Sequence, residues 1–182
     1  SPLHGVFADQ ATRRLMVGLA MGATAIGLIY SPWGKRSGAH LNPAVTLTFY
    51  RLGKIGGIDA CSYVMAQFFG GALGLWLVSR AIGKAVEHPA VNYVVTTPGP
   101  AGSGTAFVAE ALISFGLMLV VLMVSNTTSL NAWTGCVAGA LVATYIAIEA
   151  PLSGMSMNPA RSFASALPAH LWTAFWIYLT AP

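Results

Sequence analysis

Two short segments repeat the same polar pattern inside apolar surroundings, and this repeat constrains the fold more than any other feature. Residues 37–44 read Ser-Gly-Ala-His-Leu-Asn-Pro-Ala, and residues 153–160 read Ser-Gly-Met-Ser-Met-Asn-Pro-Ala. Both copies begin with Ser-Gly and end with Asn-Pro-Ala. A duplicated polar turn in an apolar chain predicts a membrane protein built from two repeats, with a pore where the two copies meet.

Each Asn-Pro pair predicts the start of a helix. Asn42 and Asn158 are suited to the N-cap, where the side-chain oxygen accepts a bond from a backbone N–H, and proline fits the first helical position. The first helix is expected to run to about residue 51 and the second to about residue 167, before Pro168. Ten residues rise about 15 Å, half of a hydrocarbon core. The pairs therefore predict two half-helices that line a cavity or lie buried in protein.

Composition excludes a soluble domain. The chain is 55% hydrophobic and 8% charged, whereas soluble domains carry about 25% charged residues. Lys and Arg are scattered along the chain, so nucleic acid is not indicated as a partner. Cys61 and Cys136 lie in apolar segments without a Cys-x-x-Cys spacing. They read as buried free thiols, and neither a metal nor a cofactor is predicted.

Five apolar spans are predicted, and three of them carry glycines four residues apart. The spans cover residues 15–30 (or 13–33), 58–78, 106–124, 133–148, and a last one that begins at 171. Glycines at this spacing allow membrane helices to approach closely. The pairs are Gly18/Gly22, Gly70/Gly74 and Gly135/Gly139. The connector at 87–105, rich in Pro, Gly and Thr, is expected to form an external loop.

The two copies of the turn have unequal surroundings. Two spans precede the second copy and one precedes the first, whereas a full span follows the first copy and a short segment follows the second. A symmetric protein would need one more helix before residue 1 and the rest of a helix after residue 182. With three spans and one half-helix in each repeat, the repeats would have inverted topology. We expect one transmembrane domain over 1–182: repeat 1 at about 1–85, the external loop at about 86–105 and repeat 2 at about 106–182.

Three motifs carry a resemblance to a known family. They are SGAHLNPAVT at 37–46, YVMAQFFGG at 63–71 and MNPARS at 157–162. With them the chain resembles the major intrinsic proteins, the aquaporins and aquaglyceroporins, and most of all a bacterial-type aquaporin. The resemblance implies an all-α membrane fold of six transmembrane helices plus two half-helices in inverted repeats, with the first helix and the end of the sixth absent from this chain. It also implies a homotetramer in the lipid bilayer of the cell membrane, with one pore in each subunit.

The repeated turns supply the expected pore residues. Each Asn would cap its helix with the side-chain oxygen and leave its NH2 free to donate to a passing water. The positive helix ends would disfavour cations and interrupt proton hopping. The pore motifs are Asn42, Pro43, Ala44, Asn158, Pro159 and Ala160. Backbone carbonyls are expected to face the pore at Gly38, Ala39, His40, Gly154, Met155 and Ser156.

Three further residues receive roles. A guanidinium at membrane depth is a functional hypothesis by default, and the resemblance places Arg161 at an external constriction. It also implies that Glu110 is a buried carboxylate that accepts bonds from the backbone of the turn at 155–157. His40 is expected to brace its own turn rather than to bind a metal. Family topology would make Lys35, Arg36, Arg51 and Lys54 cytoplasmic and Arg13, Arg14, Arg80 and Lys84 external, an even split without a positive-inside bias.

The constriction departs from the family pattern. Counting along the aligned motifs gives a filter of Met21, Ile146, Met155 and Arg161. This set is neither the Phe, His and polar set of water channels nor the aromatic pair of glycerol channels. Ser162 and the pair Phe175-Trp176 favour the water side. Glu149 is unexpected, and it is assigned either to the external mouth or to a brace of the neighbouring turn.

The favoured function is a passive channel for water that excludes protons and ions, with passage of small neutral solutes left open. One alternative is an aquaglyceroporin-like channel that conducts mainly glycerol or another small uncharged solute. A second is a secondary transporter, which needs coupled ionisable residues; Glu110, Glu149 and Arg161 are the candidates. An enzyme is disfavoured because the sequence shows no nucleophile–base pair, metal-ligand cluster or phosphate loop.

Overall fold

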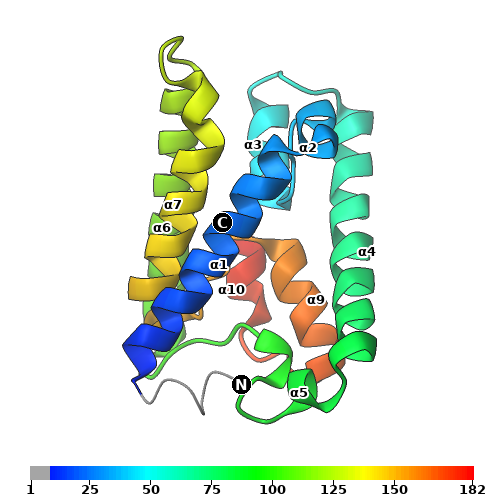
Figure 1. The fold of residues 1–182 in the computed structure, drawn as a ribbon, viewed down its shortest axis with the longest axis vertical. Helices are drawn as coiled ribbons and strands as arrows, with labels where there is room; N and C mark the ends of the chain where they lie inside the picture. Colours follow the sequence, from blue (N-terminus) through cyan, green and yellow to red (C-terminus); the bar gives the residue numbers. More distant parts are fainter. Residues whose placement is uncertain (1–8) are drawn as a thin grey trace.

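Four long apolar helices form the frame of the molecule. The computed structural model describes residues 9–182, and its long helices are α1 (Gln10–Tyr30), α4 (Gly57–Ile82), α6 (Gly102–Ser125) and α7 (Thr134–Ile148). Three of them, and α7 together with the short helix η3 (Asn131–Trp133) that precedes it, are long and apolar enough to cross a membrane, which confirms the first four predicted spans to within a few residues at their ends. Figure 1 shows α6 and α7 on the left and α4 on the right, with α1 running obliquely from the lower left to the upper centre.

Shorter helices lie between these two sides and at the ends of the long helices. Their bounds are α2 (Pro32–Ser37), α3 (Pro43–Arg51), α5 (Lys84–Glu87), η2 (Asn92–Val94), η3 (Asn131–Trp133), α8 (Ala150–Ser153), α9 (Pro159–Ala169) and α10 (Phe175–Thr180). The half-helices α3 and α9 occupy opposite halves of the molecule, and their first residues meet near its middle (Figure 1). The connector at 87–105 contains the three-residue turn η2 and otherwise few helical residues.

The second half-helix is longer than the sequence predicted. The expectation that it ends before Pro168 is wrong, because α9 continues to Ala169. Proline lacks the N–H that would bond one turn back, so α9 loses one hydrogen bond at Pro168 but keeps its helical path for one more residue. The helix ends where His170 adopts a left-handed conformation with φ 49°.

Close packing of α1 on α7 depends on small residues. A Cβ added to Gly18 would lie 2.6 Å from the carbonyl oxygen of Ala143, and one added to Gly22 would lie 2.5 Å from that of Gly139. The backbones therefore touch at these positions, as predicted for two of the three glycine pairs.

The third glycine pair and a cysteine differ from expectation, and both lie on α4. Added Cβ atoms at Gly70 and Gly74 would meet no atom within 4 Å in the described part of the chain. Cys61 is exposed rather than buried. None of the residues of α4 is buried among residues 9–182, so a wide apolar face of this helix points outward.

The buried core surrounds the second of the two repeated turns. One cluster consists of Ile113, Met155 and Met157, and a second consists of Ala106, Ile177 and Tyr178. The Tyr178 hydroxyl, at the end of α10, donates to the carbonyl of Ser153 at 2.6 Å. The second turn is therefore fixed by packing on both sides.

Candidate pore

A long apolar cavity runs beside α1. Its volume is about 1080 Å³, and its lining on α1 extends from Gln10 to Ile29. This interval corresponds to about 28 Å of helix rise, close to the thickness of a hydrocarbon core, about 30 Å. The cavity is also lined by both repeated turns, including Asn42 and Asn158. The two turns therefore lie on one path that is long enough to cross a bilayer.

Both half-helices begin with the predicted asparagine cap. The Asn42 Oδ1 accepts from the N–H of Ala44 at 2.9 Å. The Asn158 Oδ1 accepts from the N–H groups of Ala160 and Arg161 at 3.1 and 3.2 Å. Pro43 and Pro159 take the first helical positions and are buried. The caps fix both amide groups at the helix starts, where the cavity passes.

The two asparagine amides also tie the turns together. The Asn42 Nδ2 donates to the carbonyl of Met157 at 2.5 Å. The Asn158 Nδ2 donates to the carbonyl of Leu41 at 2.9 Å. An amide nitrogen carries two N–H donors, so one donor of each is used in this exchange. The expectation of a wholly free NH2 is therefore wrong, and one N–H on each amide is left for a molecule in the cavity.

The first turn is held from α4. Gly38 and Ala39 have positive φ angles of 71° and 53°, and both line the cavity. The His40 ring lies 4.9 Å from that of Tyr63 and 5.1 Å from that of Phe49. These contacts place the His40 ring between a ring of α3 and a ring of α4.

One carbonyl of the first turn differs from the prediction. The His40 carbonyl accepts from the side-chain amide of Gln67 at 2.6 Å, and His40 is not among the described residues that line the cavity. The reason is that Gln67, which also donates to the Thr46 hydroxyl at 2.9 Å, provides a half-buried donor on α4. Leu41 lines the cavity instead. A polar residue inside an apolar span was the signal that could have identified Gln67.

The second turn is held by a carboxylate from α6. Glu110 is fully buried. Its Oε1 accepts from the Ser153 hydroxyl at 2.6 Å and from the Ser156 N–H at 2.7 Å, and its Oε2 accepts from the Met157 N–H at 2.7 Å. The remaining amide, of Met155, donates to the Ser153 hydroxyl at 3.0 Å. The carboxylate charge is thus shared among three donors, as buried charge requires.

Backbone strain accompanies these bonds. Met155 and Met157 have φ angles of 50° and 53°, a left-handed conformation that costs a residue with a side chain about 1–2 kcal/mol. The bonds to Glu110 offset this cost. They hold a turn whose residues Gly154, Met155 and Ser156 all line the cavity.

Arg161 is anchored by a residue that the sequence did not identify. It lies in the first turn of α9 and lines the cavity, and its Nη1 donates to the Thr96 hydroxyl. The same hydroxyl oxygen accepts from Ser162 at 3.1 Å. Thr96 belongs to the connector before α6 and is buried. Sequence reasoning missed it because a threonine in a Pro- and Thr-rich connector carries no distinguishing pattern.

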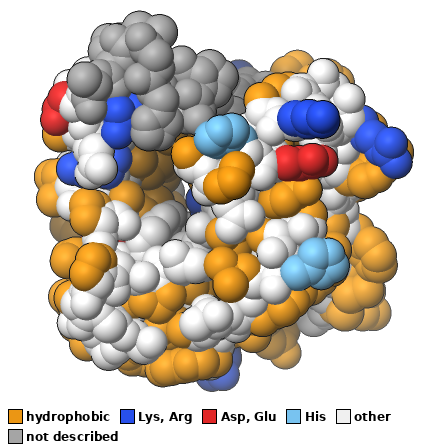
Figure 2. Space-filling view, turned by 90° about the horizontal axis from the view of Figure 1, so that it is seen from below, with side chains coloured by type: hydrophobic (Ala, Val, Ile, Leu, Met, Phe, Trp, Pro, Cys, Tyr) orange, Lys and Arg blue, Asp and Glu red, His pale blue; other side chains and the backbone are white. Residues whose placement is uncertain are grey.

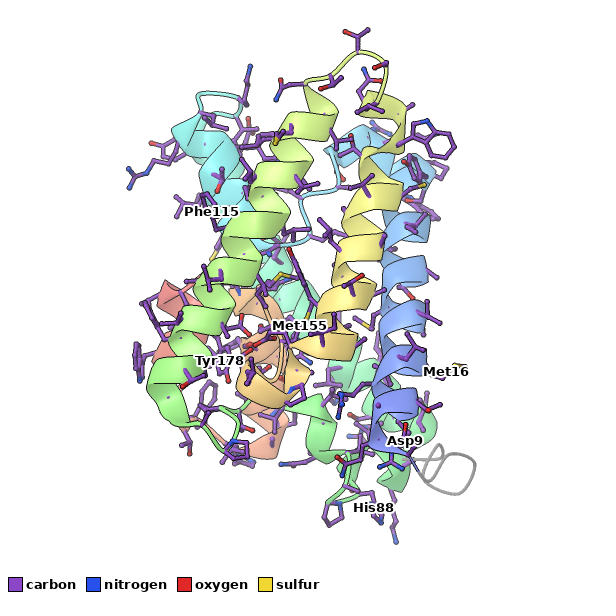
Figure 3. The ribbon with its side chains drawn as sticks, turned by 90° about the vertical axis from the view of Figure 1, so that its left-hand side faces the viewer. Asp9, Met16, His88, Phe115, Met155 and Tyr178 are labelled. Carbon is purple, nitrogen blue, oxygen red and sulfur yellow. The ribbon has the colours of Figure 1, made fainter. Side chains whose placement is uncertain are left out.

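The four expected filter residues line this cavity. Met21 comes from α1, Ile146 from α7, Met155 from the second turn and Arg161 from α9. The Met155 side chain is 5% exposed and packs with Ile113 and Met157, and Ile146 packs against this cluster. Figure 3 shows Met155 in the interior, at the level where α6 and α7 flank the second turn. Packing therefore restrains Met155, and apolar groups dominate the wall.

Glu149 does not reach the cavity. It follows the last residue of α7 and is 6% exposed, and it is not among the described residues that line the cavity. Its carboxylate lies near Ser153, whose hydroxyl donates to Glu110 at 2.6 Å, and neither carboxylate oxygen makes a well-aligned hydrogen bond among residues 9–182. Burial raises the pKa of Glu149 to about 7, with Ser153 acting in the opposite direction and the Glu110 charge adding to the rise.

Paired broken helices that meet inside an apolar helix bundle are typical of membrane transport proteins. The family profile described as Major intrinsic protein matches residues 5–182. The chain belongs to the major intrinsic protein family, whose members are channels and not enzymes. It is a multi-pass membrane protein.

Similar proteins agree with this assignment. Aquaporin NIP6-1 of Arabidopsis thaliana is 36% identical over 169 residues, which cover 92% of this chain and 53% of that protein. Probable aquaporin AqpM of Archaeoglobus fulgidus is 35% identical over 173 residues, or 91% of this chain and 70% of that protein. The chain spans about half the length of several curated relatives. The aquaglyceroporin of Plasmodium falciparum shares the fold, with a TM-score of 0.69 and 20% identity over 93% of this chain and 86% of that one.

Proposed function

We propose that this chain forms a passive transmembrane pore for water, open also to small neutral solutes and closed to protons and ions. One observation carries the proposal. The amides of Asn42 and Asn158, each bonded to the opposite turn, lie on one cavity of about 1080 Å³ that extends along most of α1. The cavity joins the starts of two half-helices, where a donor and a positive helix end face the same path.

The chemistry of the lining accounts for passage of water. A water molecule that enters an apolar constriction gives up hydrogen bonds and needs replacements. The two turns provide carbonyls, and each asparagine amide provides one remaining N–H. A water oxygen that accepts from both amides cannot also accept a proton from a neighbouring water. Together with the two positive helix ends, this arrangement opposes proton hopping and cation entry.

The filter favours a broad selectivity. Three of its four residues, Met21, Ile146 and Met155, are apolar, and Arg161 provides its side-chain donors. A wall of this kind offers water few compensating hydrogen bonds. It makes favourable contact with the apolar carbon skeleton of a small solute. We therefore infer that small neutral solutes pass as well as water. A channel that conducts mainly glycerol is the alternative, and the ratio of the two permeabilities distinguishes them.

The distribution of acids argues against coupled transport. Among residues 9–182 no Asp or Glu lines the cavity. Glu110 is occupied by three donors, and Glu149 is buried away from the path. A proton-coupled transporter needs a carboxylate that exchanges protons with the pathway. This arrangement therefore supports passive flow.

We further propose that the protein acts as a homotetramer in the cell membrane. The outward apolar face of α4 supports this assembly. It includes exposed Phe69 and Trp76, with open space at Gly70 and Gly74. Such a face suits lipid or a neighbouring subunit.

The test uses proteoliposomes that contain the full-length protein. We expect osmotic shrinkage faster than in empty liposomes, measurable entry of glycerol, and no effect of a proton gradient on either rate. A Gly27→Ala variant is the matched control, because an added Cβ there meets no neighbour, Gly27 does not line the cavity, and flow is expected to be unchanged. Shrinkage equal to that of empty liposomes, with insertion verified, would refute the channel. Dependence on the gradient would favour the transporter.

A further inference from the structure

A second guanidinium stands at the entrance of the cavity. Arg14 lies in the second turn of α1 and lines the cavity. Its Nε donates to the carbonyl of Ala147 at 3.3 Å. Ala147 directly follows Ile146, a residue of the expected filter. The bond therefore holds the Arg14 guanidinium beside the filter, at the end of the molecule where α1 begins.

The charges on the cavity wall are all of one sign. Among the described residues that line it, the charged ones are Arg13, Arg14 and Arg161, and no carboxylate is present. Figure 2 looks onto this end of the molecule, where a hollow opens in the surface and Lys or Arg side chains lie at its rim. A permeating ion would therefore meet positive charge before it reaches the constriction.

The nearest acid on the same helix does not cancel this charge within the cavity. Asp9 is exposed and caps α1, its carboxylate accepting from the backbone N–H and the hydroxyl of Thr12 at 2.7 and 2.8 Å. These bonds, with a lesser contribution from the charge of Arg14, lower the pKa of Asp9. Asp9 itself is not among the residues that line the cavity. Its charge faces solvent, where water screens it, whereas Arg14 is half-buried.

We propose that Arg14 is a second charge-selective residue of this pore, which repels cations outside the barrier formed by Arg161. The proposal rests on the channel function proposed above. Low-dielectric walls focus the field of a charge along a narrow path. Screening reduces that field over about 10 Å at 0.1 M salt. A half-buried guanidinium beside the filter thus lowers the local cation concentration, and the effect weakens as salt increases.

The experiment removes the inner barrier first. In the Arg161→Ala background, potassium entry into proteoliposomes is measured with Arg14→Gln, Arg14→Met or Arg14→Lys added. Each rate is divided by the water permeability of the same preparation, so that insertion and folding cancel. Arg80→Gln is the matched control, because Arg80 is an exposed arginine at the end of α4 outside the cavity and packs over Trp76.

We expect Arg14→Gln and Arg14→Met each to raise the normalised potassium leak about tenfold at low ionic strength. The increase should shrink at 0.5 M salt. Arg14→Lys and Arg80→Gln should leave the leak near that of Arg161→Ala. Equal potassium leak in all the double variants would overturn the proposal. A rise with Arg14→Lys as large as that with Arg14→Gln would also overturn it, because it would assign Arg14 a structural role. Absence of water flow in the unsubstituted protein would instead refute the channel itself.

Discussion

The side-chain amide of Asn42 donates to the backbone carbonyl of Met157 at 2.5 Å and so connects the two halves of the chain. The partner bond, from Asn158 to the Leu41 carbonyl, runs the other way at 2.9 Å. Each asparagine therefore performs three tasks: its oxygen caps a half-helix, one N–H binds the opposite turn, and the second N–H remains for the cavity. The stability of the bundle and the chemistry of the path depend on the same two side chains.

Replacing Asn42 with Ala removes the cap and the cross-link together. A lost asparagine cap costs about 1 kcal/mol, and a lost hydrogen bond that leaves the Met157 carbonyl unpaired costs about 1–3 kcal/mol. We expect a clear fall in the melting temperature of the purified protein. Asn126→Ala is the matched control: this exposed amide, directly after α6, bonds to the Leu122 carbonyl one turn back, so its loss should change the melting temperature little. Equal effects of the two substitutions would contradict the cross-link.

Glu110→Gln tests the support of the second turn. The Gln side chain keeps one oxygen acceptor but turns an NH2 toward the donors of the turn. At least one of the N–H groups of Ser156 and Met157 is then buried without a partner, which costs about 1–3 kcal/mol, and the left-handed Met residues lose their restraint. We expect lower stability and reduced water flow per inserted protein. Exposed Glu87→Gln serves as the control. Unchanged stability in Glu110→Gln would show that packing holds the turn without the carboxylate.

Buried Glu149 predicts a pH-dependent stability. Its pKa of about 7 lies above the ordinary value of 4.5, so between these pH values the folded protein holds a proton that the unfolded chain has lost. The contribution of Glu149 to the free energy of unfolding is therefore fully present below about pH 4.5 and is lost as the pH rises through 7. Glu110 and Ser153 are the groups that act on it.

The measurement compares melting temperatures at pH 6 and pH 8 for the natural protein and Glu149→Gln. The natural protein should melt at a lower temperature at pH 8. The neutral variant, which removes the titration while keeping the shape of the side chain, should lose most of this difference. The same pH difference in both proteins would mean that another group is responsible.

Sequence reasoning succeeded where the signal was local. The caps by Asn42 and Asn158 follow from the properties of two adjacent residues, and the four long helices follow from apolar runs. It failed where the structure depends on partners far along the chain. Thr96 reaches Arg161 across 65 positions, and no pattern in the connector predicts it. The predicted end of α9 before Pro168 was wrong because the effect of a proline on a helix depends on its distance from the helix end.

The filter can be tested by giving it one more donor. Water that passes Met21, Ile146 and Met155 finds few hydrogen bonds, and an unsatisfied polar group in an apolar site costs about 1–3 kcal/mol. Ile146→His adds a donor and bulk at the level of Arg161, so it should favour water and hinder a solute that needs apolar contact. We expect the ratio of water to glycerol permeability to rise about tenfold, the equivalent of 1.4 kcal/mol in barrier height. Ile148→His is the control, because Ile148 is 72% exposed and lies outside the cavity; its ratio should not change. If the natural protein already excludes glycerol and Ile146→His leaves the ratio as it was, Ile146 is not part of the constriction.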